Sequence, residues 1–146
     1  MLLGVVNVTL LTDFNIQDLP EAYSYLAPDG SEIRMVFSMQ HGGVCHCRLP
    51  ANHVTKAVHH KTVDEFWYFI KGSGEVWRKT DQSDVTTTVF PGICLNISVG
   101  THFQFRNTGN EPLELLIFTM PPWPGASESV DVEGQWKSTS TESNNQ

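Results

Sequence analysis

Short apolar segments separated by Gly- and Pro-containing turns recur along the middle of the chain, and this pattern constrains the fold most. Segments suited to β-strands run over 33–39, 44–49, 66–70, 75–79, 85–90, 93–97, 101–106 and 113–120. Short strands at regular spacing, bounded by turn residues, are typical of β-sandwiches and β-barrels. No long amphipathic helical pattern interrupts them. The sequence therefore predicts an all-β fold.

Length, charge and cysteine usage narrow the class of protein. A chain of 146 residues is long enough for one domain with its own hydrophobic core. A formal net charge of −7 without a basic stripe argues against a nucleic-acid partner. No apolar run is long enough to span a bilayer, and the N-terminus lacks the basic region of a signal peptide. We expect a cytoplasmic protein with no nucleic-acid or membrane partner.

The first 31 residues are predicted to form an N-terminal strand and arm. Residues 3–11 are rich in valine and leucine and predict a strand. Residues 16–26 could hold one short helical turn with Pro20 early in it. Asp29-Gly30 is a strong hairpin signal.

The rest of the chain divides into three further parts. A proline-rich segment cannot join a strand ladder, because proline lacks the amide hydrogen that the ladder requires. A tail of Ser, Thr, Glu, Asn and Gln cannot bury enough apolar surface to fold. The predicted parts are a barrel over 32–120, a Pro/Trp segment packing on it over 121–136, and a disordered tail over 137–146.

Chemistry-bearing residues concentrate between Ala57 and Gly74. A pair of histidines ends at His60, and Glu65 follows after four residues. The apolar run 66–70 then predicts a buried strand that ends in a glycine turn. A few convergent polar groups beside an apolar strand are the usual lining of a ligand pocket.

The spacing of these residues resembles the cupin family. That family has two motifs, G-x5-H-x-H-x(3–4)-E-x6-G and G-x5-P-x-G-x2-H-x3-N. The resemblance covers roughly residues 32–120 and implies a single-domain antiparallel jelly-roll β-barrel with a pocket in its mouth. It also implies a homodimer, in which a strand such as 3–11 crosses to the partner. Matching positions are His60, Glu65 and Gly72 in the first motif and Gly92, Gly100 and Asn107 in the second.

The chain departs from the family at two expected metal ligands. Cupin metals are usually held by the histidines and glutamate of the first motif and the histidine of the second. Val58 and Phe103 stand at two of these histidine positions. His59 and His102 each lie one residue away, and on a regular strand they would point to the opposite face.

These residues therefore leave two alternatives for the cofactor. The cofactor is either absent or a single divalent metal (Fe, Mn, Ni, Cu or Zn) on His60, Glu65 and a third ligand. Three protein ligands are the usual minimum for a catalytic site. The candidates for the third ligand are His102, His59, Gln104 and His53.

His60 and Glu65 are the predicted catalytic residues. An imidazole titrates near neutral pH, so His60 suits a general base or acid. Glu65 would orient His60 or carry a second proton, and apolar neighbours should raise its pKa. The residues predicted to contact substrate are Trp67, Phe103, Val58 and Cys47.

We expect a small-molecule enzyme acting on an apolar or aromatic metabolite by proton transfer, as an isomerase, cyclase or lyase. The alternatives are a metal-dependent, dioxygenase-like cupin with a rearranged ligand set and a non-catalytic ligand-binding barrel. Gln104 and Arg106 are expected to face outward, toward a subunit contact. The remaining assignments are small core residues for Cys45, Cys47 and Cys94, and loop or surface positions for His41, His46 and His53.

Overall fold

The computed structural model describes residues 14–140 and is built almost wholly of β-strands. The strand predicted over 3–11 lies outside the described residues. One short 3-10 turn, η1 (Ala126–Glu128), is the only helical element among the described residues. The strands are β1 (Tyr25–Leu26), β2 (Glu32–Ser38), β3 (Gly43–Leu49), β4 (Val58–His60), β5 (Asp64–Lys71), β6 (Gly74–Lys79), β7 (Asp84–Val89), β8 (Cys94–Ile97), β9 (His102–Asn107), β10 (Leu113–Met120) and β11 (Ser129–Asp131).

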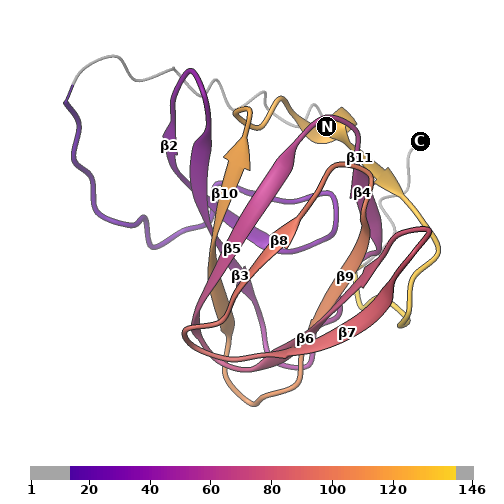
Figure 1. Ribbon diagram of the computed structural model, residues 1–146. Coiled ribbons are helices and arrows are strands. Elements are labelled where there is room, and N and C mark those ends of the chain that lie inside the picture. The colour runs from indigo at the N-terminus through magenta and orange to yellow at the C-terminus, as the bar shows by residue number, and fades with distance from the viewer. Residues whose placement is uncertain (1–13, 141–146) are drawn as a thin grey trace, which may run out of the picture.

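The strands form two antiparallel sheets that face each other, as Figure 1 shows. One sheet has the order β1-β2-β3-β10-β5-β8, and the other has the order β11-β4-β9-β6-β7. Non-consecutive neighbours such as β3 and β10 belong to a jelly-roll arrangement. The four largest fully buried side chains fill the space between the sheets: Trp67, Phe69, Phe103 and Phe105. The prediction of an all-β jelly-roll barrel is confirmed.

Every strand segment predicted from 33 to 120 corresponds to an observed strand. The turns between them are also where glycine signals placed them. Gly72 adopts φ +82° between β5 and β6, and a Cβ there would lie 2.5 Å from the carbonyl oxygen of Pro112. Only glycine fits such a position without strain.

The helical turn predicted within 16–26 does not form. Arg34 donates from Nε to the carbonyl oxygen of Pro20 at 2.9 Å and from Nη2 to that of Glu21 at 2.7 Å. Those carbonyls would have to accept the first intrahelical hydrogen bonds. The backbone of Ser24 donates instead to Ile33, and β1 pairs with β2 around the predicted Asp29-Gly30 turn.

The run 66–70 is a strand as predicted, but it is buried on one face only. Trp67 and Phe69 are buried, whereas Phe66, Tyr68 and Ile70 are between 43% and 55% exposed. Side chains alternate between the two faces of a strand, so an unbroken apolar run places apolar side chains on both faces. Both faces are buried only where other elements cover both of them.

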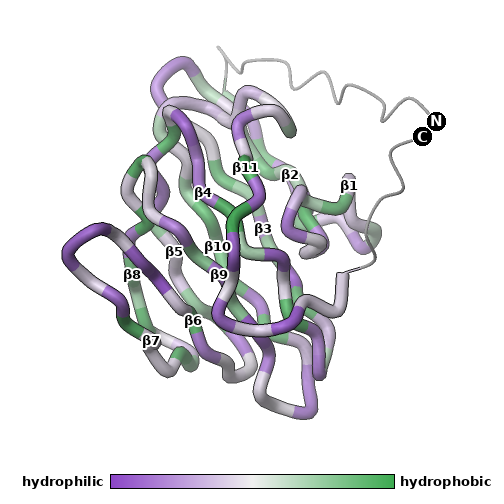
Figure 2. Tube along the Cα trace, turned by 90° about the vertical axis from the view of Figure 1, so that its right-hand side faces the viewer, coloured by the Kyte–Doolittle hydropathy of each residue, from purple (hydrophilic) through white to green (hydrophobic). Residues whose placement is uncertain are grey.

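The C-terminal segment packs along the second sheet. β11 pairs with β4, and Figure 2 shows the two strands side by side. Gln104 faces away from the barrel interior but is 1% exposed, because its amide donates to Trp136 and its carbonyl oxygen accepts from the Trp136 backbone. Arg106 packs its guanidinium 4.2 Å from the centre of the Trp136 ring. The outward-facing pair therefore contacts this chain's own C-terminal segment.

Three other expectations differ from the structure. His46 is not a surface residue: it is buried in β3, and its Nε2 lies 3.2 Å from Oε1 of Glu114. Cys94 is exposed rather than in the core. Thr139, in the segment expected to be disordered, accepts a hydrogen bond from the backbone of Val54 at 2.8 Å.

None of the helical structure within residues 14–140 has the length and apolarity that crossing a membrane would require.

Candidate functional site

A cavity lies inside the barrel, between β2, β3 and β10 on one side and β4 and β9 on the other. His60, Glu65, Trp67, Phe103 and Val58, all predicted to line a pocket, do line it. The free volume open to the centre of a water molecule is about 60 Å³. One water needs about 10–15 Å³ by this measure, so the cavity suits a small molecule.

Strand alternation brings His60 and Glu65 together. On β5 the side chains of Glu65, Trp67 and Phe69 point inward, and on β4 Val58 and His60 do. The backbone carbonyl of His60 accepts a hydrogen bond from the amide of Gly100 at 2.9 Å, which ties the end of β4 to the turn before β9.

The side chains of His60 and Glu65 form a close, buried pair. His60 Nδ1 lies 3.3 Å from Glu65 Oε1, and each residue is 5% exposed. Aromatic rings enclose the imidazole edge-on: the ring centre of Phe103 lies 5.1 Å from it and that of Trp123 lies 4.9 Å from it. These rings cover part of the imidazole and leave few alternative orientations for it.

Burial shifts the two pKa values in opposite directions. Desolvation lowers the pKa of His60 from 6.5 to about 4, although the negative charge of Glu128 opposes the shift. Desolvation also raises the pKa of Glu65 from 4.5 to about 8, although the neighbouring indole of Trp67 works against this shift. At neutral pH the pair therefore consists of a protonated carboxyl group and a neutral imidazole.

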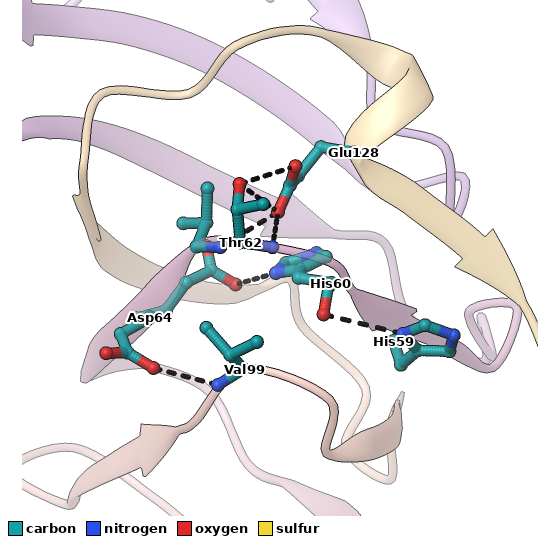
Figure 3. Close-up of polar contacts among 8 residues, drawn as sticks. His59, His60, Thr62, Asp64, Val99 and Glu128 are labelled. Carbon is teal, nitrogen blue, oxygen red and sulfur yellow. Dashed lines mark hydrogen bonds and ion pairs between the residues drawn. The ribbon is translucent and has the colours of Figure 1, made fainter.

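Glu128 of η1 anchors the loop between His60 on β4 and Glu65 on β5. Its carboxylate accepts hydrogen bonds from the backbone amides of Thr62 and Val63 and from the Thr62 hydroxyl, as Figure 3 shows. Burial tends to raise the pKa of Glu128, but these hydrogen bonds outweigh it and the pKa falls. The loop between β4 and β5 is therefore fixed by a segment more than sixty residues further along the chain.

A second carboxyl group lines the cavity. Asp29, in the turn between β1 and β2, is buried, and its Oδ1 accepts hydrogen bonds from the amide and hydroxyl of Ser31 at 2.9 Å and 2.7 Å. Desolvation raises its pKa despite these hydrogen bonds. Tyr25, Thr119 and Trp123 also line the cavity. The sequence did not assign Asp29, Tyr25 or Thr119 to the site, since the hairpin signal at Asp29 did not show that the turn folds inward, whereas Trp123 was a candidate to pack across the barrel mouth or against a partner subunit.

Two of the residues predicted for the site lie elsewhere. Cys47 is fully buried in the core and does not line the cavity, whereas Cys45, two residues earlier on the same face, does. His102 is on the opposite face of its sheet, where its ring stacks on that of His59 with centres 5.5 Å apart. No bulge turns either histidine inward, as the adjacent pairing of Val58 with Phe103 shows.

The donor set does not fit the metal site implied by the cupin resemblance. Within residues 14–140, no group of three or more His, Cys, Asp and Glu side chains is arranged to hold a metal ion. His60 and Glu65 supply two ligands, and Val58 and Phe103 fill the remaining positions with apolar side chains. The rearranged set with His102 is not assembled, because His102 lies outside the barrel.

Several solved structures share this fold. A protein of Bacillus halodurans, BH2720, matches with a TM-score of 0.59 and 25% identity over 70% of this chain and 76% of its own. Oxalate decarboxylase of Lactobacillus farciminis, in a formate complex, gives a TM-score of 0.62 and 17% identity over 70% of this chain and 31% of its own. The capsular polysaccharide assembling protein CapF of Staphylococcus aureus gives 0.61 and 14% over 71% and 32%. The chain thus spans about a third of the two larger proteins.

No curated protein matches the sequence. The cupin-domain family model matches residues 45–119, which contain both motifs, the pocket pair and most of both sheets. The chain therefore belongs to the cupin family.

Proposed function

We propose that this cupin is an enzyme that moves a proton within a small apolar or aromatic molecule, as an isomerase, cyclase or lyase does. The observation that supports this most directly is the buried contact of 3.3 Å between His60 Nδ1 and Glu65 Oε1 in the wall of the cavity. A base and an acid within reach of the same small volume are what proton abstraction and return require.

The protonation states of the pair assign the two roles. Neutral His60 accepts a proton from the substrate, and protonated Glu65 donates one to the atom where negative charge develops. After both transfers an imidazolium faces a carboxylate, and their attraction stabilises the charges that the step creates. The nearby negative charge of Glu128 also favours the imidazolium.

Activity should be confined to a pH range set by the two pKa values. His60 serves as a base only above its pKa of about 4, and Glu65 serves as an acid only below its pKa of about 8. The rate should therefore follow a bell-shaped curve between these limits.

The experiment is proton exchange with solvent, because it reports the reaction class before the substrate is known. A panel of small carbonyl compounds is incubated with the protein in D2O, and deuterium uptake at carbon is followed by NMR. His60→Gln and Glu65→Gln should each lower exchange by about 100-fold or more. His102→Gln is the matched control, since this histidine lies outside the cavity and should leave exchange unchanged.

Two results would contradict the proposal. If the panel binds but wild type exchanges no faster than the His60 and Glu65 variants, the barrel binds ligands without catalysis. If the purified protein contains a near-stoichiometric divalent metal that is lost in His60→Ala, the pair is part of a metal site and the metal-dependent alternative replaces proton transfer.

A further inference from the structure

The described lining of the cavity carries no permanent positive charge. Among the described residues that line it, none is lysine or arginine. The lining carries one imidazole and two carboxyl groups, those of His60, Glu65 and Asp29, and all three side chains are at least 92% buried. An anion placed there would lose its hydration without gaining a counter-charge, which is strongly unfavourable.

The ionisable side chains of the cavity all shift toward their uncharged forms. Burial is the leading cause in each case: it raises the pKa values of Tyr25, Asp29, Cys45 and Glu65 and lowers that of His60. The surroundings that disfavour charge on these five groups disfavour charge on a ligand for the same reason. A cation would enter only if a neighbouring carboxyl group gave up its proton.

The cavity does offer a hydrogen-bond donor and a narrow apolar space. Protonated Glu65 presents an O–H group, and Thr119 lies opposite it on the paired strand β10. Ile33 and Ile117 line the cavity with aliphatic surface, and Phe103 lines it with an aromatic ring. A flat group with a hydrogen-bond acceptor at one end matches this arrangement.

We propose that the cavity selects small uncharged molecules carrying a planar carbonyl or amide acceptor and rejects organic anions and cations of the same shape. This proposal rests on the proposed function in one respect, because His60 and Glu65 are taken from it as the reacting pair. The selectivity itself follows from the missing counter-charge and can be tested without any turnover.

The test uses three ligands of equal shape and different charge: isobutyramide, isobutyrate and isobutyramidine. Binding at pH 6.5 is followed by NMR, with the indole N–H signals of Trp67 and Trp123 reporting the cavity and that of Trp136 serving as a control outside it. We expect the amide to bind at least about tenfold more tightly than either charged ligand. Absence of this preference, or a preference for isobutyrate or isobutyramidine, overturns the proposal.

A change of pH sharpens the test. The groups whose charges interact with Glu65 or that lie beside it are His60, Asp29, Tyr25, Cys45 and Cys47. Among the described residues that line this part of the cavity, none is lysine or arginine. Above pH 8 Glu65 ionises, so isobutyramidine should bind more tightly to wild type at pH 9 than at pH 6.5. The isosteric variant Glu65→Gln should show much less of this gain. An equal gain in both proteins would contradict the role given to Glu65.

A gain-of-function variant completes the design. Met35 lines the cavity and is half-buried, so Met35→Lys introduces a cation with little change of volume. This variant should bind isobutyrate in preference to isobutyramide; an unchanged ranking in the folded variant would overturn the counter-charge argument. If the variant does not fold, the wild-type ranking decides alone. If the wild-type protein prefers the amide but catalyses no proton exchange, only the proposed function is contradicted.

Discussion

The two faces of β5 carry similar apolar residues and have opposite environments. Trp67 and Phe69 on the inner face are 2% and 0% exposed, whereas Phe66 and Tyr68 on the outer face are 55% and 43% exposed. The inner residues belong to the hydrophobic core, and the outer ones continue onto Phe118 of β10, which pairs with Phe66. Hydrophobicity alone therefore does not tell which face belongs to the core.

We propose that the outer face is the contact between two copies of the chain. The centre of this face is uncharged, and the acidic Asp64 and Glu114 lie at its two ends, which matters for self-association of a chain with a net charge of −7. An exposed apolar patch of aromatic residues on a sheet is typical of an interaction surface. The uncharged residues at the centre of this outer face are Phe66, Tyr68, Ile70, Cys94, Asn96, Leu116 and Phe118.

The largest effect is expected from truncating the inner face. Trp67→Ala removes a ring that contacts Phe69, Phe103 and Phe105, so it should lower the free energy of unfolding by about 3–5 kcal/mol. Tyr68→Ala on the outer face should cost less than about 1 kcal/mol at dilution where copies do not associate. Urea denaturation measures both, and equal losses would show that the two faces are not distinct.

Association should depend on the outer face. Phe66→Arg is expected to weaken dimerisation by at least about 30-fold, because it places a desolvated charge in the contact. Sedimentation equilibrium measures the change. Val85→Arg on β7 is the matched control, because Val85 is 50% exposed but lies on the other sheet. A dimer that survives Phe66→Arg and dissociates with Val85→Arg would move the contact to β7.

The buried pair should make stability depend on pH. Folded Glu65 keeps its proton to about pH 8, whereas an ordinary glutamate loses it near 4.5, so Glu65 makes stability fall as pH rises between these values. His60 has the opposite effect between about 4 and 6.5, because there the unfolded chain binds more protons.

Of the two residues of the pair, only Glu65 still contributes between pH 6.5 and 8. The free energy of unfolding should fall by about 2 kcal/mol over that range, and Glu65→Gln should remove most of the fall. Denaturation at several pH values measures it. A flat profile in wild type would mean that the carboxyl group is ionised in the folded protein.

The smallest effect concerns the anchor at the start of β5. Glu128→Gln keeps an acceptor for Thr62 but loses the charge, so it should cost about 1 kcal/mol of stability. It should also lower the pKa of His60 further, since the negative charge of Glu128 favours the protonated imidazole. Histidine NMR titration detects this shift. Stability loss without a change at His60 would make Glu128 a structural anchor alone.

Local pattern was sufficient to predict the strands, the turn at Gly72 and the approach of His60 to Glu65. These features depend on the alternation of side chains along a strand, on the conformational freedom of glycine and on the short spacing between His60 and Glu65 in the sequence. The direction of the Glu65 pKa shift was also predictable, because its neighbours on the strand are apolar. The same alternation correctly turned His59 and His102 away from the pocket.

Contacts between distant segments decided the rest. Asp29 enters the cavity from roughly 30 residues before His60, and nothing in its own surroundings in the sequence indicates that. Gln104 is buried because residues near Trp136 cover it, and His46 is buried beside Glu114 of the neighbouring strand β10. The chain by itself determined which side chains share a strand face. Which of those faces is desolvated, and therefore which groups lose their charge, depends on the segments that the tertiary fold lays across them.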